Sequence, residues 1–300
     1  MTLADIRIDD RYPTRIADDA KPLERTDPTV WGTAKDGPMD QATLASHDAK
    51  GFSIVEGLLS PAEVQGYWQE LIRLTRDEPL KADERVVTEK ASGEVRSIFE
   101  VHELSDLIAE LVLDPRVLDR ARQILGSDVY IHQCRVNYMP GFKGKGFYWH
   151  SDFETWHAED GMPKPRAVSC SIALTDNYPF NGGLMVMPGS QRTFVQCTGE
   201  TPADHYKSSL KEQEIGVPSR NDITTMAAEH GIDQFTGQAG SALWFDSNIM
   251  HASGNNITPY PRSNIFMVFN SVENALGEPF SAGTRRPTFI ASRDCTPLTR

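Results

Sequence analysis

Two histidines and one aspartate have the residue types and the spacing of ligands to a single metal ion. His150 and Asp152 stand two positions apart, and His251 follows much later in the chain. In an extended segment, residues two positions apart project to the same side, so this imidazole and this carboxylate would converge on one point. Two imidazoles and one carboxylate on one face of an octahedral ion form the facial triad of non-haem Fe(II) sites. Because the chain has eight histidines, the pattern also fits one surface and one core histidine with no metal.

An arginine shortly after His251 extends this pattern. The intervening residues 255–261 are rich in turn formers, so the chain would reverse there and bring Arg262 beside the metal on the next strand. A guanidinium binds a carboxylate through two parallel hydrogen bonds. This suits 2-oxoglutarate, whose keto-acid end chelates iron and whose far carboxylate needs a buried cation. Taken alone, Arg262 would more simply be an exposed surface arginine.

A strand with one polar face precedes the His-x-Asp pair. Side chains alternate with a period of two over residues 129–139, which places Gln133, Arg135 and Asn137 on one face. Such a face is either exposed to solvent or lines a wet pocket. The candidate iron site that follows favours the pocket.

The remaining elements predict a mainly β fold with flanking helices. Ser60, Pro61 and Glu63 form a capping box with proline at the first helical position, so a helix begins there. Helices first and many short strands afterwards are typical of a β-sandwich or jelly-roll core. Further helices are predicted near residues 105–112, 114–125 and 222–230, and further strands near 51–55, 167–173, 183–187, 241–245 and 264–271.

Composition bounds the organisation of the chain. We expect residues 1–45 to form an irregular N-terminal arm and residues 46–300 to form a single domain, with a polar insertion near 197–238. The N-terminus lacks the apolar stretch of a signal peptide, and no apolar run approaches the ~20 residues that span a bilayer. We therefore expect a cytoplasmic protein without a membrane partner. None of the four cysteines belongs to a Cys-x-x-Cys pair, which favours reduced thiols.

The chain is acidic, with a formal net charge of -12 and an isoelectric point near 5.1. A surface of this charge repels phosphate backbones, so nucleic acid is not an expected partner.

The segment around the His-x-Asp pair also carries a family resemblance. Residues 147–157, continuing through 159–163, resemble the signature stretch of the ectoine hydroxylases, which belong to the phytanoyl-CoA dioxygenase superfamily. Residues 181–190 resemble the turn-and-strand motif of that superfamily, and the likeness spans roughly residues 52–289. The resemblance implies a double-stranded β-helix, or cupin-like jelly roll. It further implies Fe(II) as cofactor, 2-oxoglutarate and O2 as cosubstrates, and conversion of ectoine to 5-hydroxyectoine with release of succinate and CO2. Osmotic-stress metabolism and a homodimer are also implied.

The resemblance assigns roles to individual positions. The implied iron ligands are His150, Asp152 and His251; the implied 2-oxoglutarate contacts are Arg262, Asn137, Phe147, Ser169 and Ser253; and the implied substrate contacts are Gln133, Thr155, Trp156, Phe266 and Arg286. One position departs from the family, because many members carry at position 139 a lysine that contacts 2-oxoglutarate, and this chain has Met139. If that contact is general, the chain relies more heavily on Arg262.

The implied substrate residues suit a small zwitterion. Ectoine carries a carboxylate and a flat delocalised cation, so its site needs a cation, a hydrogen-bond acceptor and aromatic faces. Arg286 would bind the carboxylate, Gln133 would accept from a ring N–H, and Trp156 with Phe266 would enclose the flat cation. The alternative for Trp156 is a purely structural role as an aromatic side chain of the core.

Two other functions fit part of this pattern. One is the same chemistry on another small amino-acid-like substrate. The other is a cupin-like module that binds a ligand without catalysis, which would need neither an open iron site nor a cosubstrate clamp. The presence of both Asp152 and Arg262 argues against such a module. Asp152 also favours hydroxylation over halogenation, because halogenases of this superfamily leave that position free for halide.

Overall fold

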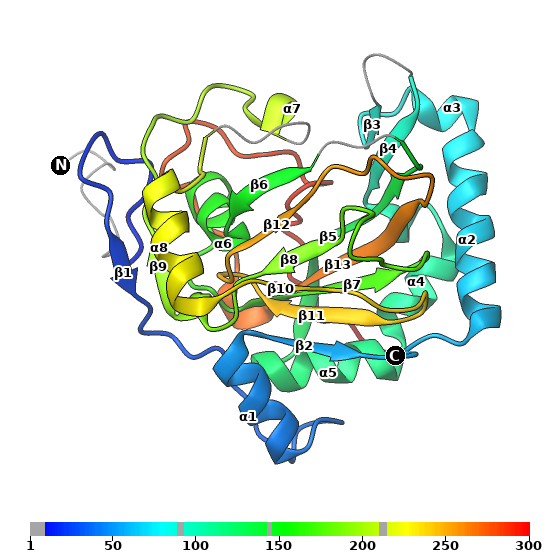
Figure 1. Cartoon of the computed structure of the whole chain (residues 1–300), viewed down its shortest axis with the longest axis horizontal. Helices are drawn as coiled ribbons and strands as arrows, with labels where there is room; N and C mark the ends of the chain where they lie inside the picture. Colours follow the sequence, from blue (N-terminus) through cyan, green and yellow to red (C-terminus); the bar gives the residue numbers. More distant parts are fainter. Residues whose placement is uncertain (1–9, 89–92, 143–145, 210–214) are drawn as a thin grey trace.

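The computed structural model describes residues 10–88, 93–142, 146–209 and 215–300. Two antiparallel sheets lie face to face (Figure 1), one of seven strands in the order β2-β11-β7-β13-β5-β4-β3 and one of four strands in the order β10-β8-β12-β6. A further pair, β1 and β9, lies at one side. The predicted jelly-roll core with flanking helices is confirmed.

The strands are short except for β5 and β13, which pair along their whole lengths. Their bounds are β1 Pro22–Glu24, β2 Phe52–Val55, β3 Val86–Thr88, β4 Val95–Phe99, β5 Val129–Met139, β6 Phe147–His150, β7 Ala167–Ala173, β8 Leu184–Val186, β9 Thr193–Val195, β10 Asp233–Gln234, β11 Ala242–Asp246, β12 His251–Ser253 and β13 Arg262–Ser271. The helices are α1 Gln41–Lys50, α2 Pro61–Arg76, α3 Glu78–Lys81, α4 Asp106–Leu113, α5 Pro115–Leu125, α6 Asp152–Thr155, α7 Tyr206–Ser209 and α8 Arg220–His230, with short turns η2 Val101–Glu103, η3 Trp156–Asp160, η4 Ser190–Arg192 and η5 Val272–Asn274.

Strand β7 shows how the two faces of the large sheet differ. Val168, Cys170 and Ile172 point to the face that packs on α2, α4 and α5. Ala167 and Ala173 point to the opposite face, into a second apolar cluster between the sheets. Because side chains alternate along a strand, one strand serves the structural core with one face and the interior of the jelly roll with the other.

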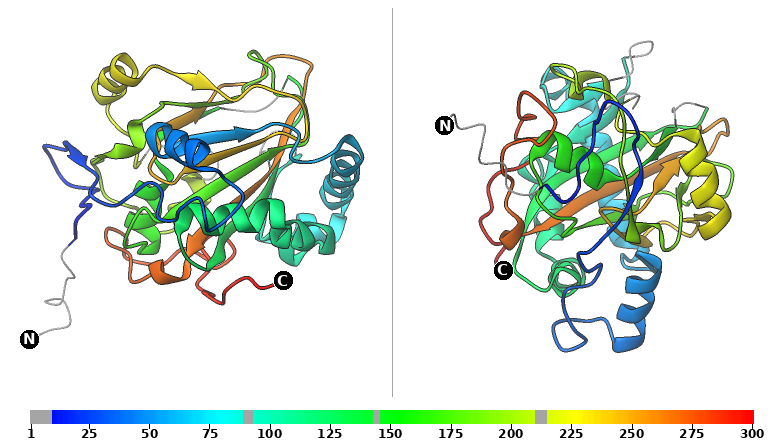
Figure 2. Two further views of the ribbon diagram at one scale, coloured as in Figure 1. Left: turned by 90° about the horizontal axis from the view of Figure 1, so that it is seen from below. Right: turned by 90° about the vertical axis from the view of Figure 1, so that its left-hand side faces the viewer.

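Helices cover the outer face of the large sheet. In the left view of Figure 2, α1 and α5 lie in front of the strands, on one side of the molecule. The predicted start of α2 is confirmed by both capping-box bonds, in which the Glu63 backbone N–H donates to Ser60 Oγ (3.3 Å) and the Ser60 N–H donates to Glu63 Oε2 (2.7 Å). None of the described helices is long and apolar enough to cross a membrane.

Several predicted elements have the expected bounds, and others were missed. Strands β5 and β7 begin and end at the predicted residues, and α5 ends before Gly126 as expected. Strands β3 and β4, which widen the large sheet, were not predicted. Within the predicted arm, β1 pairs with β9 and α1 begins at Gln41. The division of the chain at residue 45 and the insertion at 197–238, part of which lies outside the described residues, remain predictions.

Candidate active site

The three candidate metal ligands meet where the small sheet ends. His150 is the last residue of β6, His251 is the first of β12, and the two are direct partners in the antiparallel ladder. His150 and Asp152 do not share a strand, because β6 ends at His150 and Asp152 is the first residue of α6. Ser151 caps that helix by accepting from the Glu154 N–H and keeps an extended backbone. The side chains of His150 and Asp152 therefore still project to the same side, across the junction of strand and helix.

The donor atoms of these residues suit a metal ion. The backbone carbonyl of Tyr148 accepts from Nδ1 of His150 (2.7 Å), and that of Ile249 accepts from Nδ1 of His251 (3.1 Å), which fixes Nε2 as the free lone pair on each ring. Nε2 of His150 and of His251 lie 3.7 and 3.8 Å from the Asp152 carboxylate oxygens. Among the described residues, the buried Oδ2 of Asp152 has no hydrogen-bond partner.

These observations fit Fe(II). One ligand atom from each of the three residues lies within 4.8 Å of the others. Burial, and then the neighbouring His251, lowers the pKa of His150 to about 4, so its imidazole is neutral near pH 7 and able to bind a metal. Two neutral imidazoles and a carboxylate on one face form the donor set of non-haem Fe(II) sites.

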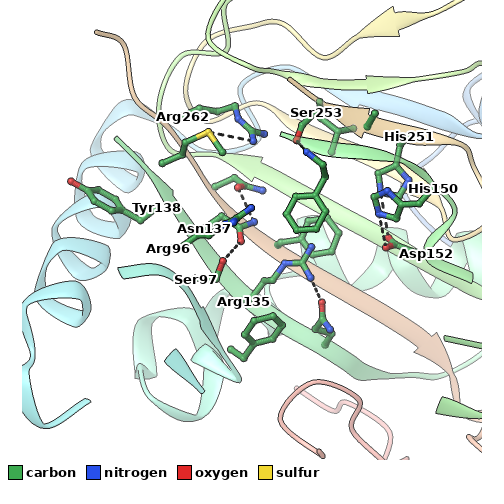
Figure 3. Close-up of a pocket in the computed structure, with 18 of the residues that line it drawn as sticks. Arg96, Ser97, Arg135, Asn137, Tyr138, His150, Asp152, His251, Ser253 and Arg262 are labelled. Carbon is green, nitrogen blue, oxygen red and sulfur yellow. Dashed lines mark hydrogen bonds and ion pairs between the residues drawn. The ribbon is translucent and has the colours of Figure 1, made fainter. Parts of the chain in front are cut away.

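A cavity between the two sheets opens onto this centre, and its lining contains almost every residue singled out in the sequence. Figure 3 shows His150, Asp152 and His251 gathered at one end of the cavity, with Arg262 near the other end. The predicted site residues that line it are His150, Asp152, His251, Arg262, Met139, Asn137, Phe147, Ser253, Gln133, Thr155, Trp156, Phe266 and Arg286. The polar face of β5 therefore lines a pocket, and the alternative of solvent exposure is wrong.

Arg262 reaches the cavity from the opposite sheet, so the prediction that it lies beside the metal was wrong. The turn after β12 carries the chain from the small sheet to the large one, where Arg262 begins β13 opposite Met139. Its Nη2 donates to Met139 Sδ at 3.7 Å, and its buried Nε has no hydrogen-bond partner among the described residues. Burial, and then the charge of Arg96, lowers the pKa of Arg262 to about 10. Such a guanidinium is suited to a carboxylate from a ligand.

Ser169 is the one predicted site residue that the structure does not place in the cavity lining. It lies on the central strand β7, in register with Phe245 and Val268, and is fully buried. Its hydroxyl has no hydrogen-bond partner among the described residues. Its assignment as a 2-oxoglutarate contact remains a prediction.

The substrate half of the cavity is already dense with internal contacts. Gln133 donates to the Ile290 carbonyl (2.7 Å), and its amide oxygen accepts from Arg135. The Arg135 guanidinium lies 4.3 Å from the centre of the Phe266 ring, where we expected the cationic part of the substrate. Arg286 is held by Asp160 through two hydrogen bonds of 2.7 and 2.5 Å. The predicted substrate contacts thus come together. Some of their hydrogen-bonding groups and one aromatic face are already used by contacts with other protein side chains and backbone.

Two more arginines line the cavity. Arg135 was predicted on the polar face of β5 with Gln133 and Asn137, but it was given no role in binding. Arg96 comes from the unpredicted strand β4, and its guanidinium lies 5.1 Å from the centre of the Phe147 ring. With Arg262 and Arg286 they give an acidic protein a cationic cavity, which suits anionic ligands such as dicarboxylates.

The comparisons with known proteins agree with this geometry. The chain matches the model of the family "Phytanoyl-CoA dioxygenase (PhyH)" over residues 47–264. The chain belongs to the phytanoyl-CoA dioxygenase family. It is 66% identical over 289 residues to the ectoine dioxygenase of Nocardia farcinica, with 96% of this chain and 95% of the relative covered. It is 49% identical to that of Halomonas elongata, with 94% and 86% covered.

Solved structures of EctD from S. alaskensis share this architecture. EctD from S. alaskensis with 2-oxoglutarate and 5-hydroxyectoine superposes on the chain with a TM-score of 0.86 at 44% identity, covering 95% of each chain. The form of that enzyme with bound Fe superposes with a TM-score of 0.84. The resemblance seen in the segment around the His-x-Asp pair is confirmed, and the chain is a 2-oxoglutarate-dependent dioxygenase.

Proposed function

We propose that this protein hydroxylates ectoine to 5-hydroxyectoine with Fe(II), consuming 2-oxoglutarate and O2 and releasing succinate and CO2. The observation that carries the proposal is the nearly full-length similarity to ectoine dioxygenases, in a chain whose cavity contains a complete donor set for Fe(II). The S. alaskensis relative with 2-oxoglutarate and 5-hydroxyectoine in its structure supports the same substrate.

The ligand residues would hold the metal from two directions. His150 and His251 come from adjacent strands of the small sheet, and Asp152 comes from the helix that starts directly after β6. Bound Fe(II) supplies the activation of O2, coupled to oxidative decarboxylation of 2-oxoglutarate. The backbone carbonyls of Tyr148 and Ile249 keep both rings in the tautomer that presents Nε2.

Arg262 would bind the far carboxylate of 2-oxoglutarate. It is buried and has a weak sulfur acceptor instead of a carboxylate partner among the described residues. Asn137 and Ser253 line the same part of the cavity with polar groups, and Phe147 adds an apolar wall. A charged ligand group in this enclosed place gains more from a guanidinium than it would in water.

Thr155, Trp156 and Arg286 would position the substrate. All three line the cavity, and Trp156 is almost fully buried. These residues would aim one C–H bond at the iron and keep water away from it. Gln133 and Phe266 would support this half through their contacts with Arg135.

We further propose a cytoplasmic homodimer that acts in compatible-solute metabolism under osmotic stress. The family resemblance supports this setting, in which a polar zwitterion is modified where it accumulates. Light scattering of the purified protein would give the mass of the assembly, and a monomer at working concentration would contradict the dimer.

The function is tested in two steps with the purified protein. Anaerobic Fe(II) and 2-oxoglutarate should together produce the visible charge-transfer band of the chelate, and addition of ectoine and air should then give 5-hydroxyectoine, identified by NMR. A normal chelate band without product from ectoine would overturn the substrate while leaving the cofactor assignment intact.

A further inference from the structure

A single stretch of chain connects the metal centre with the substrate half of the cavity. Helix α6 begins with Asp152 and continues directly into the π-helical turn η3, which ends at Asp160. π-helical turns are rare and are concentrated at functional sites. Gly161 ends the turn with φ 77°, and a Cβ there would lie 2.5 Å from the backbone oxygen of Glu278. The turn is thus held tightly against the C-terminal segment, and its last side chain is directed inward.

Asp160 holds one wall of the cavity. Its carboxylate is fully buried and accepts from Nε and Nη2 of Arg286 at 2.7 and 2.5 Å. This side-on pair uses one edge of the guanidinium, and within the described part of the chain Nη1 makes no hydrogen bond. The Asp160 backbone oxygen accepts from Arg293 Nη2 at 2.9 Å, which anchors the residue independently of its side chain.

The Asp160 carboxylate also lies close to His132, a buried residue that packs against the cavity-lining Trp156. Nε2 of His132 is 3.5 Å from Asp160 Oδ2, and both ring nitrogens of this buried histidine lack a hydrogen-bond partner among the described residues. The His132 ring meets the indole of Trp156 edge-on, with centroids 4.9 Å apart. His132 does not line the cavity, whereas Trp156 and Arg286 do.

We propose that Asp160 is the positioning residue of the substrate half: its carboxylate fixes the guanidinium of Arg286 and lies against His132, the ring that packs edge-on against the indole of Trp156. Without this pair, a long flexible arginine would have to be ordered each time a substrate binds. With the pair, the free edge of Arg286 is already aimed when the substrate carboxylate arrives. This inference rests on the proposed hydroxylation of ectoine.

The neighbouring residue Glu159 provides a matched comparison. It is equally buried and lies on the same turn, but its carboxylate contacts Arg15 at 3.2 Å and His205 at 2.8 Å. It is 3.9 Å from Arg286, too far for a hydrogen bond. Glu159 therefore joins the turn to the N-terminal arm and to the segment around His205, and it should affect stability more than substrate affinity.

The test compares Asp160→Asn and Glu159→Gln in the full-length holoenzyme. Asp160→Asn should raise the KM for ectoine at least tenfold and lower the ratio of 5-hydroxyectoine to succinate below one half. The KM for 2-oxoglutarate and the Fe(II)–2-oxoglutarate absorption band should stay within twofold of wild type. Glu159→Gln should lower the Tm and leave the KM for ectoine within threefold of wild type.

Two further proteins serve as controls: a conservative Asp160 variant and the wild type. Asp160→Glu retains the charge one methylene further out and should give a KM for ectoine between those of wild type and Asp160→Asn; it carries the test if the asparagine variant does not fold. A folded Asp160 variant with wild-type KM and coupling would overturn the inference, as would equal KM effects at Asp160 and Glu159. Wild type that ignores ectoine would instead overturn the proposed function on which the inference rests.

Discussion

The two ends of the cavity are held together by different interactions. At the metal end, His150 and His251 are ladder partners on adjacent strands, so backbone hydrogen bonds fix their positions before any ligand binds. At the substrate end, Arg286 of the irregular C-terminal segment is held by a buried ion pair with Asp160, and outside the cavity lining the buried pair Arg15–Glu154 joins the N-terminal arm to α6. The metal ligands are therefore placed by sheet register, whereas substrate recognition depends on charged side chains from distant parts of the chain.

This difference makes the two ends separable in experiments. Changes at the metal end should remove all turnover, including the decarboxylation of 2-oxoglutarate. Changes at the substrate end should leave the Fe(II)–2-oxoglutarate complex intact. They should uncouple decarboxylation of 2-oxoglutarate from hydroxylation of the substrate.

The largest effect is expected at the metal ligands. Replacement of His150, Asp152 or His251 with Ala removes one donor of the only three-residue metal cluster found among the described residues. Turnover should fall by about 10³-fold or more, toward the background of the assay, while the circular dichroism spectrum stays close to wild type. His230→Ala, a histidine outside the cavity lining, is the control. Near-normal activity in any one ligand variant would remove that residue from the donor set.

The metal end was also the part that the sequence predicted well. The His-x-Asp spacing is local, whereas the position of Arg262 depends on the chain crossing from the small sheet to the large one. The substrate end could not be predicted in the same way, because it depends on pairs such as Asp160 with Arg286, which no local pattern connects. Arg96 was missed because it lies on β4, a short strand that follows no clear alternation.

The next effect in size concerns the cosubstrate. Arg262→Ala removes the buried guanidinium proposed to bind the far carboxylate, at a cost of roughly 3 kcal/mol, or about 100-fold in the 2-oxoglutarate requirement. Arg262→Lys keeps the charge but loses the forked geometry of the guanidinium. Its 2-oxoglutarate requirement should lie between those of wild type and Arg262→Ala. Titration of the anaerobic Fe(II) enzyme with 2-oxoglutarate measures both. An unchanged requirement in the alanine variant would place the carboxylate elsewhere.

Smaller losses are expected from the aromatic and amide groups of the substrate half. Trp156→Ala removes a buried face worth up to ~2 kcal/mol to a cation. Gln133→Ala leaves Arg135 without its partner and should cost about 1–3 kcal/mol. Both variants should form a normal Fe(II)–2-oxoglutarate complex and release succinate in excess over 5-hydroxyectoine. If both hydroxylate ectoine with wild-type affinity and coupling, the substrate lies elsewhere.

The smallest expected effect is a gain. Met139 faces Arg262, and a lysine at this position would add a second cation near the carboxylate. Met139→Lys should tighten 2-oxoglutarate binding by about fivefold, which corresponds to roughly 1 kcal/mol. Met139→Leu keeps the apolar volume and should leave binding unchanged. Weaker binding in the lysine variant would mean that repulsion from Arg262 and Arg96 outweighs attraction to the ligand.

The account is tested most directly by the stoichiometry of the wild-type reaction. Succinate and 5-hydroxyectoine are quantified in the same sample after incubation with ectoine, Fe(II), 2-oxoglutarate and air. The two products should form in a ratio close to one, and both should depend on ectoine. Succinate without 5-hydroxyectoine, combined with coupled hydroxylation of another small amino-acid-like compound, would contradict the substrate assignment.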